Sequence, residues 1–274
     1  MDTRFWGPSG WKLLHLMSFA YNPKTDKAAM KEFITTLPYV LPCKFCRTSL
    51  IQYYEELPFE DALESAAAFS RWMWKIHGKV NEKLRSQGQT IPPDPSYANV
   101  KKVYLDRLSY GCSKTDFPGW EFLFSIVENH PFNKGERSSP ISGAPPLEDI
   151  DPKDEETLLR WNYLTPERGY PYLCRFWQTL PSVLPFSEWR SAWKTKGQAF
   201  CPRVWSSRQE SLQELWKIRC SIEHELELIN RTNFQELCSD LRLHRSACSK
   251  SRSSRTRTCR RKRRRFGFGS RYAK

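Results

Sequence analysis

The sequence predicts an all-α protein: a bundle of four helices with a short fifth, then a second mainly helical domain and a basic tail. Three observations predict this class. Apolar residues recur at helical spacing in successive segments, proline-containing breaks separate the segments, and no long stretch alternates apolar and polar residues as strands do. We expect domains over residues 1–108 and 109–240 and a disordered tail over 241–274.

The composition supports a buried core and carries no membrane signal. Hydrophobic residues make up 39% and aromatic residues 14% of the 274 residues. No apolar run approaches the roughly 18 residues of a membrane span, and the first residues lack the apolar core of a signal peptide. We therefore expect an intracellular protein. Nine cysteines are many for that compartment, and their odd number leaves at least one unpaired within the chain.

The net charge of +14 belongs to the tail alone. Residues 241–274 contain 14 Lys and Arg and no acidic residue, which leaves 30 basic and 30 acidic residues in the rest of the chain. The run Arg260–Arg265 predicts contact with nucleic-acid phosphates, or a packaging or nuclear-localisation signal. A solvated terminus without a partner is the alternative.

Two helices are expected first, over residues 3–21 and 26–40. The first has an apolar face and a second face with Trp11 and His15. Taken alone, these two residues are most simply a core aromatic beside a hydrogen-bonded histidine. Asn22-Pro23 separates the two helices.

The stretch Leu41-Pro42-Cys43-Lys44-Phe45-Cys46 organises the rest of the chain, and a third helix is expected from Arg47 to Glu56. If Pro42 and Cys43 open a helix, free backbone N–H groups point at Cys43, and with Lys44 they favour a thiolate. A reactive thiol beside a resolving thiol suits dithiol–disulfide exchange. The spacing alone equally fits half a zinc site or coincidence.

A fourth helix is expected over residues 61–84 and a short fifth over 96–109, with a proline-rich break over 91–95. Trp74, His77 and Asn81 form a second stripe beside the packing stripe of the fourth helix. Polar groups at this spacing suggest a ligand, although a helix end leaving the core would look the same. Farther on, residues 134–152 have linker composition. Helices are expected over 122–128, 154–164, 171–184 and 187–194, and from the capping box at Ser207.

Residues 4–105 resemble the Erv/ALR family of flavin-linked sulfhydryl oxidases. Three motifs carry the resemblance, in order: Trp6-Gly7-x-x-x-Trp11-x-x-x-His15, Pro42-Cys43-x-x-Cys46, and Trp74-x-x-His77-x-x-Val80-Asn81-x-Lys83-Leu84. The short amino-terminus and the extra carboxy-terminal region most resemble the enzymes of large DNA viruses. That likeness would place the protein in the host cytoplasm and in the virion.

The resemblance implies a helical bundle that holds FAD at its mouth. Cys43 and Cys46 would be catalytic, with Cys46 against the flavin and Cys43 facing the substrate. No metal is expected, and the residues implied to bind the cofactor are Gly7, Trp11, His15, His77, Val80, Asn81, Lys83 and Tyr104. Electrons would pass from thiol-containing protein substrates through the cysteine pair to FAD and then to O2, giving H2O2. A homodimer is implied too, as is a second cysteine pair on a flexible segment. The candidates for that pair are Cys248 and Cys259 in the tail, with Cys238 just before it.

The chain departs from the family pattern at two places. Gly78 stands where the family has an asparagine, which removes one side-chain contact with the cofactor. No cysteine lies between residues 46 and 112, so the family's structural disulfide is missing, and Tyr97 stands near the position of its first cysteine. The fifth helix must then be held by packing and by the preceding prolines.

Two other functions fit parts of the sequence. Cys43, Cys46, His15 and His77 could make a four-ligand zinc site. Alternatively, a structural or packaging protein could bind nucleic acid through the tail and carry an incidental cysteine pair. Bound flavin would favour the oxidase over both.

Overall fold

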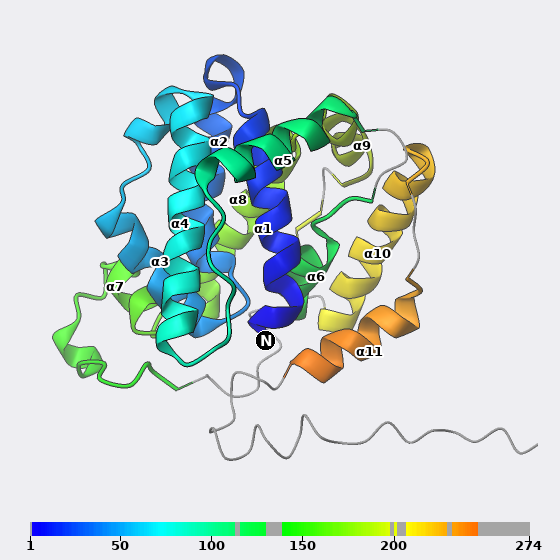
Figure 1. Cartoon of the computed structure of the whole chain (residues 1–274). Helices are drawn as coiled ribbons and strands as arrows, with labels where there is room; N and C mark the ends of the chain where they lie inside the picture. Colours follow the sequence, from blue (N-terminus) through cyan, green and yellow to red (C-terminus); the bar gives the residue numbers. More distant parts are fainter. Residues whose placement is uncertain are drawn as a thin grey trace, which may run out of the picture.

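The computed structural model of the protein describes residues 2–112, 116–129, 139–197, 200–201, 207–228 and 232–245. Within these ranges the chain forms eleven α-helices and two short 3₁₀ helices and no strand (Figure 1). This confirms the predicted all-α class.

The amino-terminal bundle consists of α1 (Thr3–Ala20), α2 (Pro23–Val40), α3 (Lys44–Glu56) and α4 (Ala66–Ser86). The side chains of Asp2, Asn22 and Ser65 accept backbone hydrogen bonds at the starts of α1, α2 and α4, which satisfies N–H groups that have no partner inside a helix. Apolar side chains on these helices, such as Phe33 and Phe69, are completely buried.

The helix expected over residues 61–84 is divided in two. Asp61–Glu64 forms the 3₁₀ helix η1, and α4 begins at Ala66. Ser65 has an extended backbone, and its hydroxyl accepts a hydrogen bond from the N–H of Ala68. A capping serine in this conformation starts a new helix and cannot continue the preceding one.

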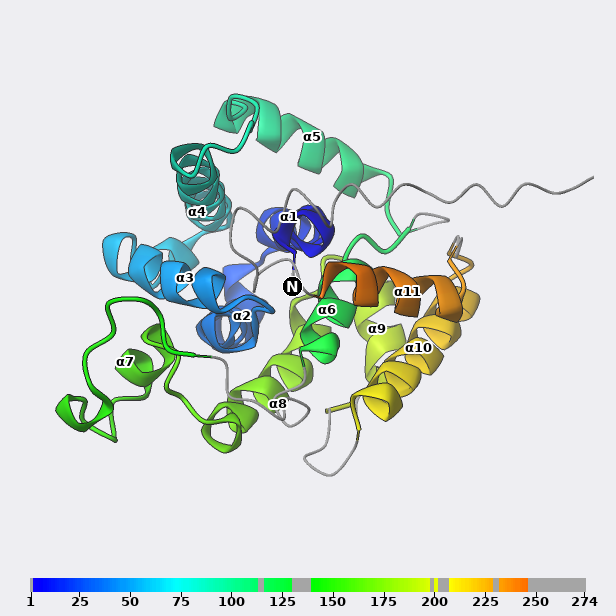
Figure 2. The ribbon, with the colours of Figure 1, turned by 90° about the horizontal axis from the view of Figure 1, so that it is seen from below.

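Helix α5 (Tyr97–Ser109) lies beside α1 and α4 (Figure 2). The Tyr97 hydroxyl lies 2.8 Å from the hydroxyl of Ser70, and the Trp74 indole N–H donates to the carbonyl of Pro95 at 3.0 Å. Packing and the proline-rich segment therefore hold the start of α5, as the sequence predicts. Trp74 thereby joins α4 to the segment before α5.

The carboxy-terminal region packs directly on the bundle. It contains α6 (Trp120–Glu128), the 3₁₀ helix η3 (Leu147–Asp149), α7 (Glu155–Arg160), α8 (Pro166–Val183), α9 (Ser187–Gly197), α10 (Arg208–Glu225) and α11 (Phe234–His244). Helix α8 runs along α2, where the rings of Phe33 and Phe176 lie 5.1 Å apart. The residues expected as separate domains over 1–108 and 109–240 thus share one apolar core.

Helix α11 is not predicted by the sequence, and the tail boundary expected at residue 241 falls inside it. Asn233 and Glu236 form a capping box at its start, and Leu237 and Leu241 are buried. The backbone N–H of Asp2 donates to the carbonyl of His244, so α11 meets the amino-terminus. The rest of the tail, with Cys248, Cys259 and Arg260–Arg265, lies outside the described residues.

A disulfide joins Cys174 in α8 to Cys201, 27 residues later. The sequence left this pairing open, because connectivity cannot be deduced from spacing.

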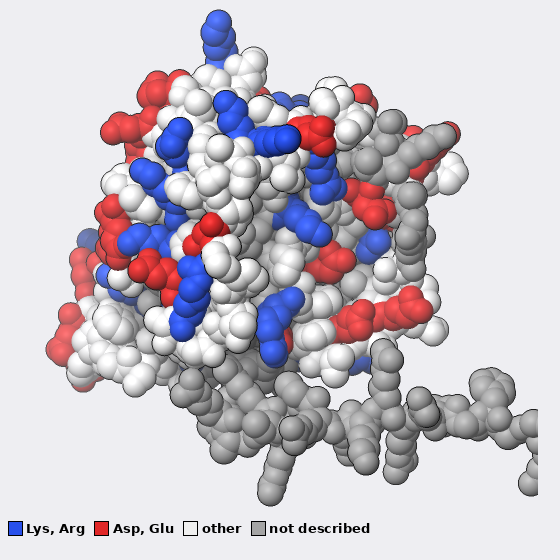
Figure 3. Space-filling view, viewed as in Figure 1, with Lys and Arg blue, Asp and Glu red and all other residues white. Residues whose placement is uncertain are grey.

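Figure 3 shows basic and acidic side chains interspersed over the visible face. This agrees with the equal numbers of both signs in residues 1–240. Among the described helices, none combines the length and apolar character that a membrane span needs.

Candidate active site

The cysteine pair lies at the start of α3. Cys43 is the N-cap residue and Cys46 lies in the first turn, where its N–H donates to the carbonyl of Cys43 at 3.0 Å. The helix begins at Lys44, three residues before the start expected from the sequence. Its free N–H groups therefore face the cysteine pair, and this end carries the positive end of the helix dipole.

Side-chain cations surround this end of α3. Lys44 follows Cys43, and Arg47 follows Cys46. The ammonium group of Lys83, on α4, donates to the carbonyl of Phe45 at 3.3 Å and to the hydroxyl of Ser49. Partial burial lowers the pKa of Lys44, and the neighbouring charge of Arg47 lowers it further, whereas Cys43 opposes the shift. Positive charge close to a thiol favours its nucleophilic thiolate form.

The two cysteines differ in exposure. Cys43 is 4% exposed, whereas Cys46 is half-buried and Phe45 between them is 43% exposed. The resemblance implies that Cys43 faces the substrate, but in this structure its surface is almost fully covered. A large thiol partner therefore cannot reach it without some change in the cover.

Four of the predicted cofactor residues come together between α1, α4 and α5. Trp11 stacks on His77, with ring centroids 4.0 Å apart. Nε2 of His15 lies 3.0 Å from Nδ1 of His77, and the ring of Tyr104 lies 5.0 Å from that of His15. We call Trp11, His15, His77 and Tyr104 the histidine cluster.

Both histidines of this cluster are neutral at pH 7. Burial lowers the pKa of His15 to about 3, helped by the charge of His77. Burial lowers the pKa of His77 to about 4, although Asp94 acts in the opposite direction. One ring therefore donates and the other accepts in the contact between them, and the cluster presents an uncharged aromatic surface.

The remaining predicted residues lie around the cluster and make other contacts. Asn81 donates to Asp94 at 2.6 Å, and Asp94 also pairs with Arg85. Val80 packs against the core. Gly7 lies one turn before Trp11 on α1, and a Cβ built there meets no described atom within 4 Å.

Two residues near the site were not singled out from the sequence. Asp94 accepts a hydrogen bond from Asn81. The only sequence signal for Asp94 is its position in the proline-rich break. Arg47 donates to the carbonyl of Leu41 at 2.8 Å and to the side chain of Asn162 at 3.0 Å. A partner 115 residues away leaves no local signal in the sequence.

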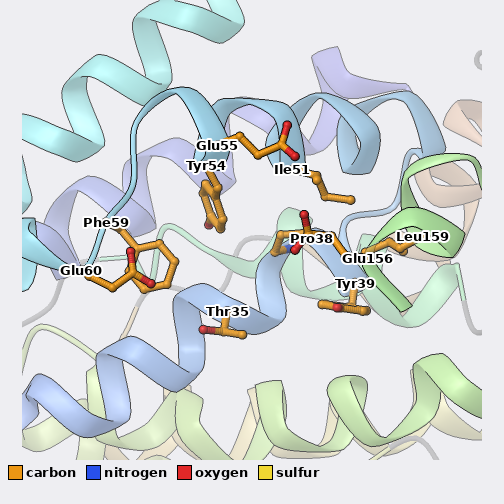
Figure 4. Close-up of a pocket in the computed structure, with 10 residues that line it drawn as sticks. All are labelled: Thr35, Pro38, Tyr39, Ile51, Tyr54, Glu55, Phe59, Glu60, Glu156 and Leu159. Atoms are coloured by element: carbon orange, nitrogen blue, oxygen red, sulfur yellow. The ribbon is translucent and has the colours of Figure 1, made fainter. Parts of the chain in front are cut away.

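A cavity of about 290 Å³ opens between α2, α3 and α7 (Figure 4). Its lining combines aromatic rings with carboxylates, among them Tyr39, Tyr54, Phe59, Glu55, Glu60 and Glu156. None of the predicted cofactor residues lines it. Arg160 pairs with Glu55 and Glu156, so its single positive charge offsets part of the charge of the three lining carboxylates.

Within the described part of the chain, no three His, Cys, Asp or Glu side chains gather as a metal-binding group. The alternative zinc site of Cys43, Cys46, His15 and His77 therefore has no support in the geometry.

Comparisons with known proteins point to one family. The model of the Erv1/Alr family matches residues 8–101. The chain is 36% identical over 87 residues to the mitochondrial FAD-linked sulfhydryl oxidase ERV1 of Saccharomyces cerevisiae, a match that covers 31% of this chain and 45% of the yeast protein.

Two viral proteins also match about a third of the chain. The "Probable FAD-linked sulfhydryl oxidase R368" of Acanthamoeba polyphaga mimivirus is 33% identical over 96 residues, which are 34% of this chain and 67% of that protein. The 347L protein of Invertebrate iridescent virus 6, also named for FAD-linked sulfhydryl oxidase activity, is 29% identical over 103 residues, 34% of this chain and 89% of the viral protein. No solved structure matches significantly.

Proposed function

This chain belongs to the Erv1/Alr family of FAD-linked sulfhydryl oxidases, and from that premise we propose that Cys43 and Cys46 are the redox pair with which it forms disulfides in thiol proteins. The observation that carries the proposal is the position of the pair. The two cysteines lie at a helix start among Lys44, Arg47 and Lys83, on the same bundle as the histidine cluster.

The exchange steps follow from thiol chemistry. A substrate thiolate attacks the sulfur of Cys43 in the Cys43–Cys46 disulfide, forms a mixed disulfide and releases Cys46 as a thiolate. The second substrate thiolate then attacks the substrate sulfur of the mixed disulfide. This forms the substrate disulfide and releases Cys43 as a thiolate. The cysteine pair thereby gains two electrons. When bound, FAD would accept these two electrons and pass them to O2, which is reduced to H2O2.

The histidine cluster is the part of the chain that would hold the flavin. Nδ1 of His15 is buried and finds no hydrogen-bond partner among the described residues. A buried polar atom of this kind is costly unless something satisfies it. Gly7 and Gly78 border open space on α1 and α4. An unsatisfied donor or acceptor, a flat neutral aromatic surface and free space fit an aromatic ring system with polar edges.

The roles of the chain's own residues can be stated on this basis. Trp11 and His77 would contact the cofactor's rings, and His15 would bond to a polar edge. Lys83 ties α4 to the first turn of α3 through the carbonyl of Phe45, so it would fix the distance between cofactor and Cys46. Asn81, held by Asp94, would position this part of α4.

The test uses three cysteine variants. The purified protein should carry FAD and consume O2 with dithiothreitol. Cys43→Ser and Cys46→Ser should each abolish O2 consumption and keep the flavin, because other residues hold it. Cys220→Ser, a half-buried thiol on α10, should behave like the wild type. Near wild-type turnover by either of the first two variants would exclude this pair.

The tail and the oligomeric state are secondary parts of the proposal. The basic residues beyond Arg245 would bind nucleic acid through phosphates, with an affinity that falls steeply with salt. Removal of residues 246–274 should abolish that binding and leave dithiothreitol oxidation intact; unchanged binding would contradict the assignment. We also propose that the protein is a homodimer, which light scattering can check. Its proposed location is the host cytoplasm and the virion.

A further inference from the structure

A segment outside the family match is bonded to the helix that carries the cysteine pair. Residues 139–164, here called the strap, contain η3 and α7 and lie beside α3 (Figure 2). Lys44 donates to the carbonyl of Ser139 at 2.7 Å, and the hydroxyl of Thr48 donates to the carbonyl of Arg160 at 2.6 Å. The amino-terminal part of α3 is thus attached to the strap near both of its ends.

Asn162 closes a chain of hydrogen bonds around the pair. Its side chain accepts from Arg47 at 3.0 Å and donates to the carbonyl of Ser139 at 3.0 Å. Arg47 also donates to the carbonyl of Leu41, two residues before Cys43. Lys44 and Asn162 both donate to the carbonyl of Ser139. The residues on both sides of the cysteines are therefore tied to one strap residue.

The backbone of Asn162 fits this role. Its φ is 64°, in the left-handed region that asparagine tolerates better than most residues. Inside the strap, the N–H of Ile141 donates to the carbonyl of Trp161 at 3.1 Å and joins the two ends of the segment. The strap is therefore internally tied, and not an open loop.

This arrangement bears on which thiols can react. Exchange requires a substrate thiolate to reach the sulfur of Cys43, and that residue is 4% exposed. We propose that the strap, held by Arg47 and Asn162, selects among thiol substrates, so that Cys43 accepts small dithiols and extended peptide segments and excludes thiols on folded protein surfaces. The inference rests on the proposed oxidase function. Asn162 acts here as a positioning residue, through its hydrogen bonds to Arg47 and Ser139, and not on the reacting sulfur.

The experiment opens the strap in two ways. Asn162→Gly removes both amide hydrogen bonds and keeps a backbone that tolerates positive φ. Thr48→Val removes the bond to Arg160 with nearly the same side-chain volume. The matched control is Tyr163→Phe, which removes the hydrogen bond from Tyr163 to Pro145 inside the strap but no bond to α3.

The readout is selectivity. For each variant, kcat/KM is measured with dithiothreitol, with reduced unfolded ribonuclease and with folded reduced thioredoxin. In both opening variants kcat/KM for thioredoxin should rise about tenfold, since each loses at least one hydrogen bond that holds the strap against α3. The value for dithiothreitol should not change, and Tyr163→Phe should match the wild type throughout.

A second readout does not need turnover. In the reduced protein, modification of Cys43 by a bulky maleimide is compared with modification by iodoacetamide, and the labelled peptide is identified by mass spectrometry. Opening the strap should accelerate only the bulky reagent. Unchanged selectivity and labelling in both opening variants, or equal changes in Tyr163→Phe, would overturn the inference. Failure of the oxidase proposal looks different, because dithiothreitol would then not be oxidised by any form.

Discussion

The indole of Trp11 stacks on the imidazole of His77 with ring planes 9° apart. This contact joins α1 to α4 at the place where the family resemblance puts the flavin. Trp11 is half-buried and His77 is too, so both rings retain surface that a further ring could cover.

We predict that Trp11→Ala lowers FAD affinity and, with it, the melting temperature of the FAD-bound protein. A bound ligand at free concentration c stabilises the folded state by RT ln(1 + c/Kd), so a larger Kd reduces the shift that a given FAD concentration produces. The measurement is the melting temperature with and without excess FAD. Phe5→Ala is the control, because Phe5 lies on the same helix but stacks on His244.

The control separates lost stability from lost binding. Phe5→Ala should lower both melting temperatures and keep the FAD-induced shift. If Trp11→Ala retains the full shift, Trp11 does not contact the cofactor.

The pair His15–His77 predicts acid sensitivity. In the folded state their pKa values are about 3 and about 4, below the usual value near 6.5 of an unfolded chain. As pH falls below about 6.5, the unfolded chain binds protons that the folded chain cannot, so the free energy of unfolding decreases by up to about 1.4 kcal/mol per pH unit for each histidine. Above about pH 6.5 both histidines are neutral in the folded and the unfolded chain, so they no longer change the free energy of unfolding with pH.

Urea unfolding of the FAD-free protein between pH 7.5 and 4.5 measures this effect. A His15→Asn/His77→Gln variant should show a shallower decline below pH 6.5 than the wild type. His224→Gln removes an exposed histidine on α10 and should keep the wild-type slope. Parallel curves for wild type and double variant would show that the two rings are not held neutral.

Local features of this fold were predictable from the sequence, and distant pairings were not. The capping box of Ser207 and Glu210 is visible in four residues and is present at the start of α10. The end of α1 follows from Asn22-Pro23, and the start of α5 follows from the prolines before Ser96. In each case the determining interaction lies within a few residues of the chain, so sequence spacing identifies it.

The contacts that were missed depend on the tertiary fold. Arg47 meets Asn162 only because residues beyond 108 fold back on α3, and Asp26 pairs with Arg190, 164 residues away. Helix α11 has only Leu237 and Leu241 buried, so its apolar pattern is too short to distinguish it from the basic tail that follows. Of the site, the sequence motifs contain Trp11, His15 and His77 of the histidine cluster, but they gave no indication that Cys43 is buried.

The disulfide between Cys174 and Cys201 should contribute measurably to stability. It closes a loop with a sequence separation of 27, for which chain entropy predicts about 3.5 kcal/mol. The Cys174→Ser/Cys201→Ser variant should therefore unfold at lower urea concentration, with FAD occupancy unchanged. Cys220→Ser should have a much smaller effect. Equal midpoints for wild type and double variant would mean that the bond adds nothing to the folded state.

The last prediction concerns the glycine that replaces the family's asparagine. Gly78 follows His77 on α4, and a Cβ at this position would meet no described atom within 4 Å. Both Gly78→Ala and Gly78→Asn therefore fit without strain. Alanine should stabilise the FAD-free protein by about 1 kcal/mol and asparagine by only a few tenths, following their helix propensities.

FAD affinity should rank the two variants in the opposite order. If Gly78 borders the cofactor, Gly78→Asn supplies an amide that can hydrogen-bond to it and should tighten binding about fivefold to tenfold, the value of one net hydrogen bond. Gly78→Ala adds no polar group and should bind FAD as the wild type does. Titration of FAD-free protein followed by flavin fluorescence gives both constants. Identical affinities in all three proteins would place this face of α4 away from the cofactor, and would remove the reason for expecting a side chain there.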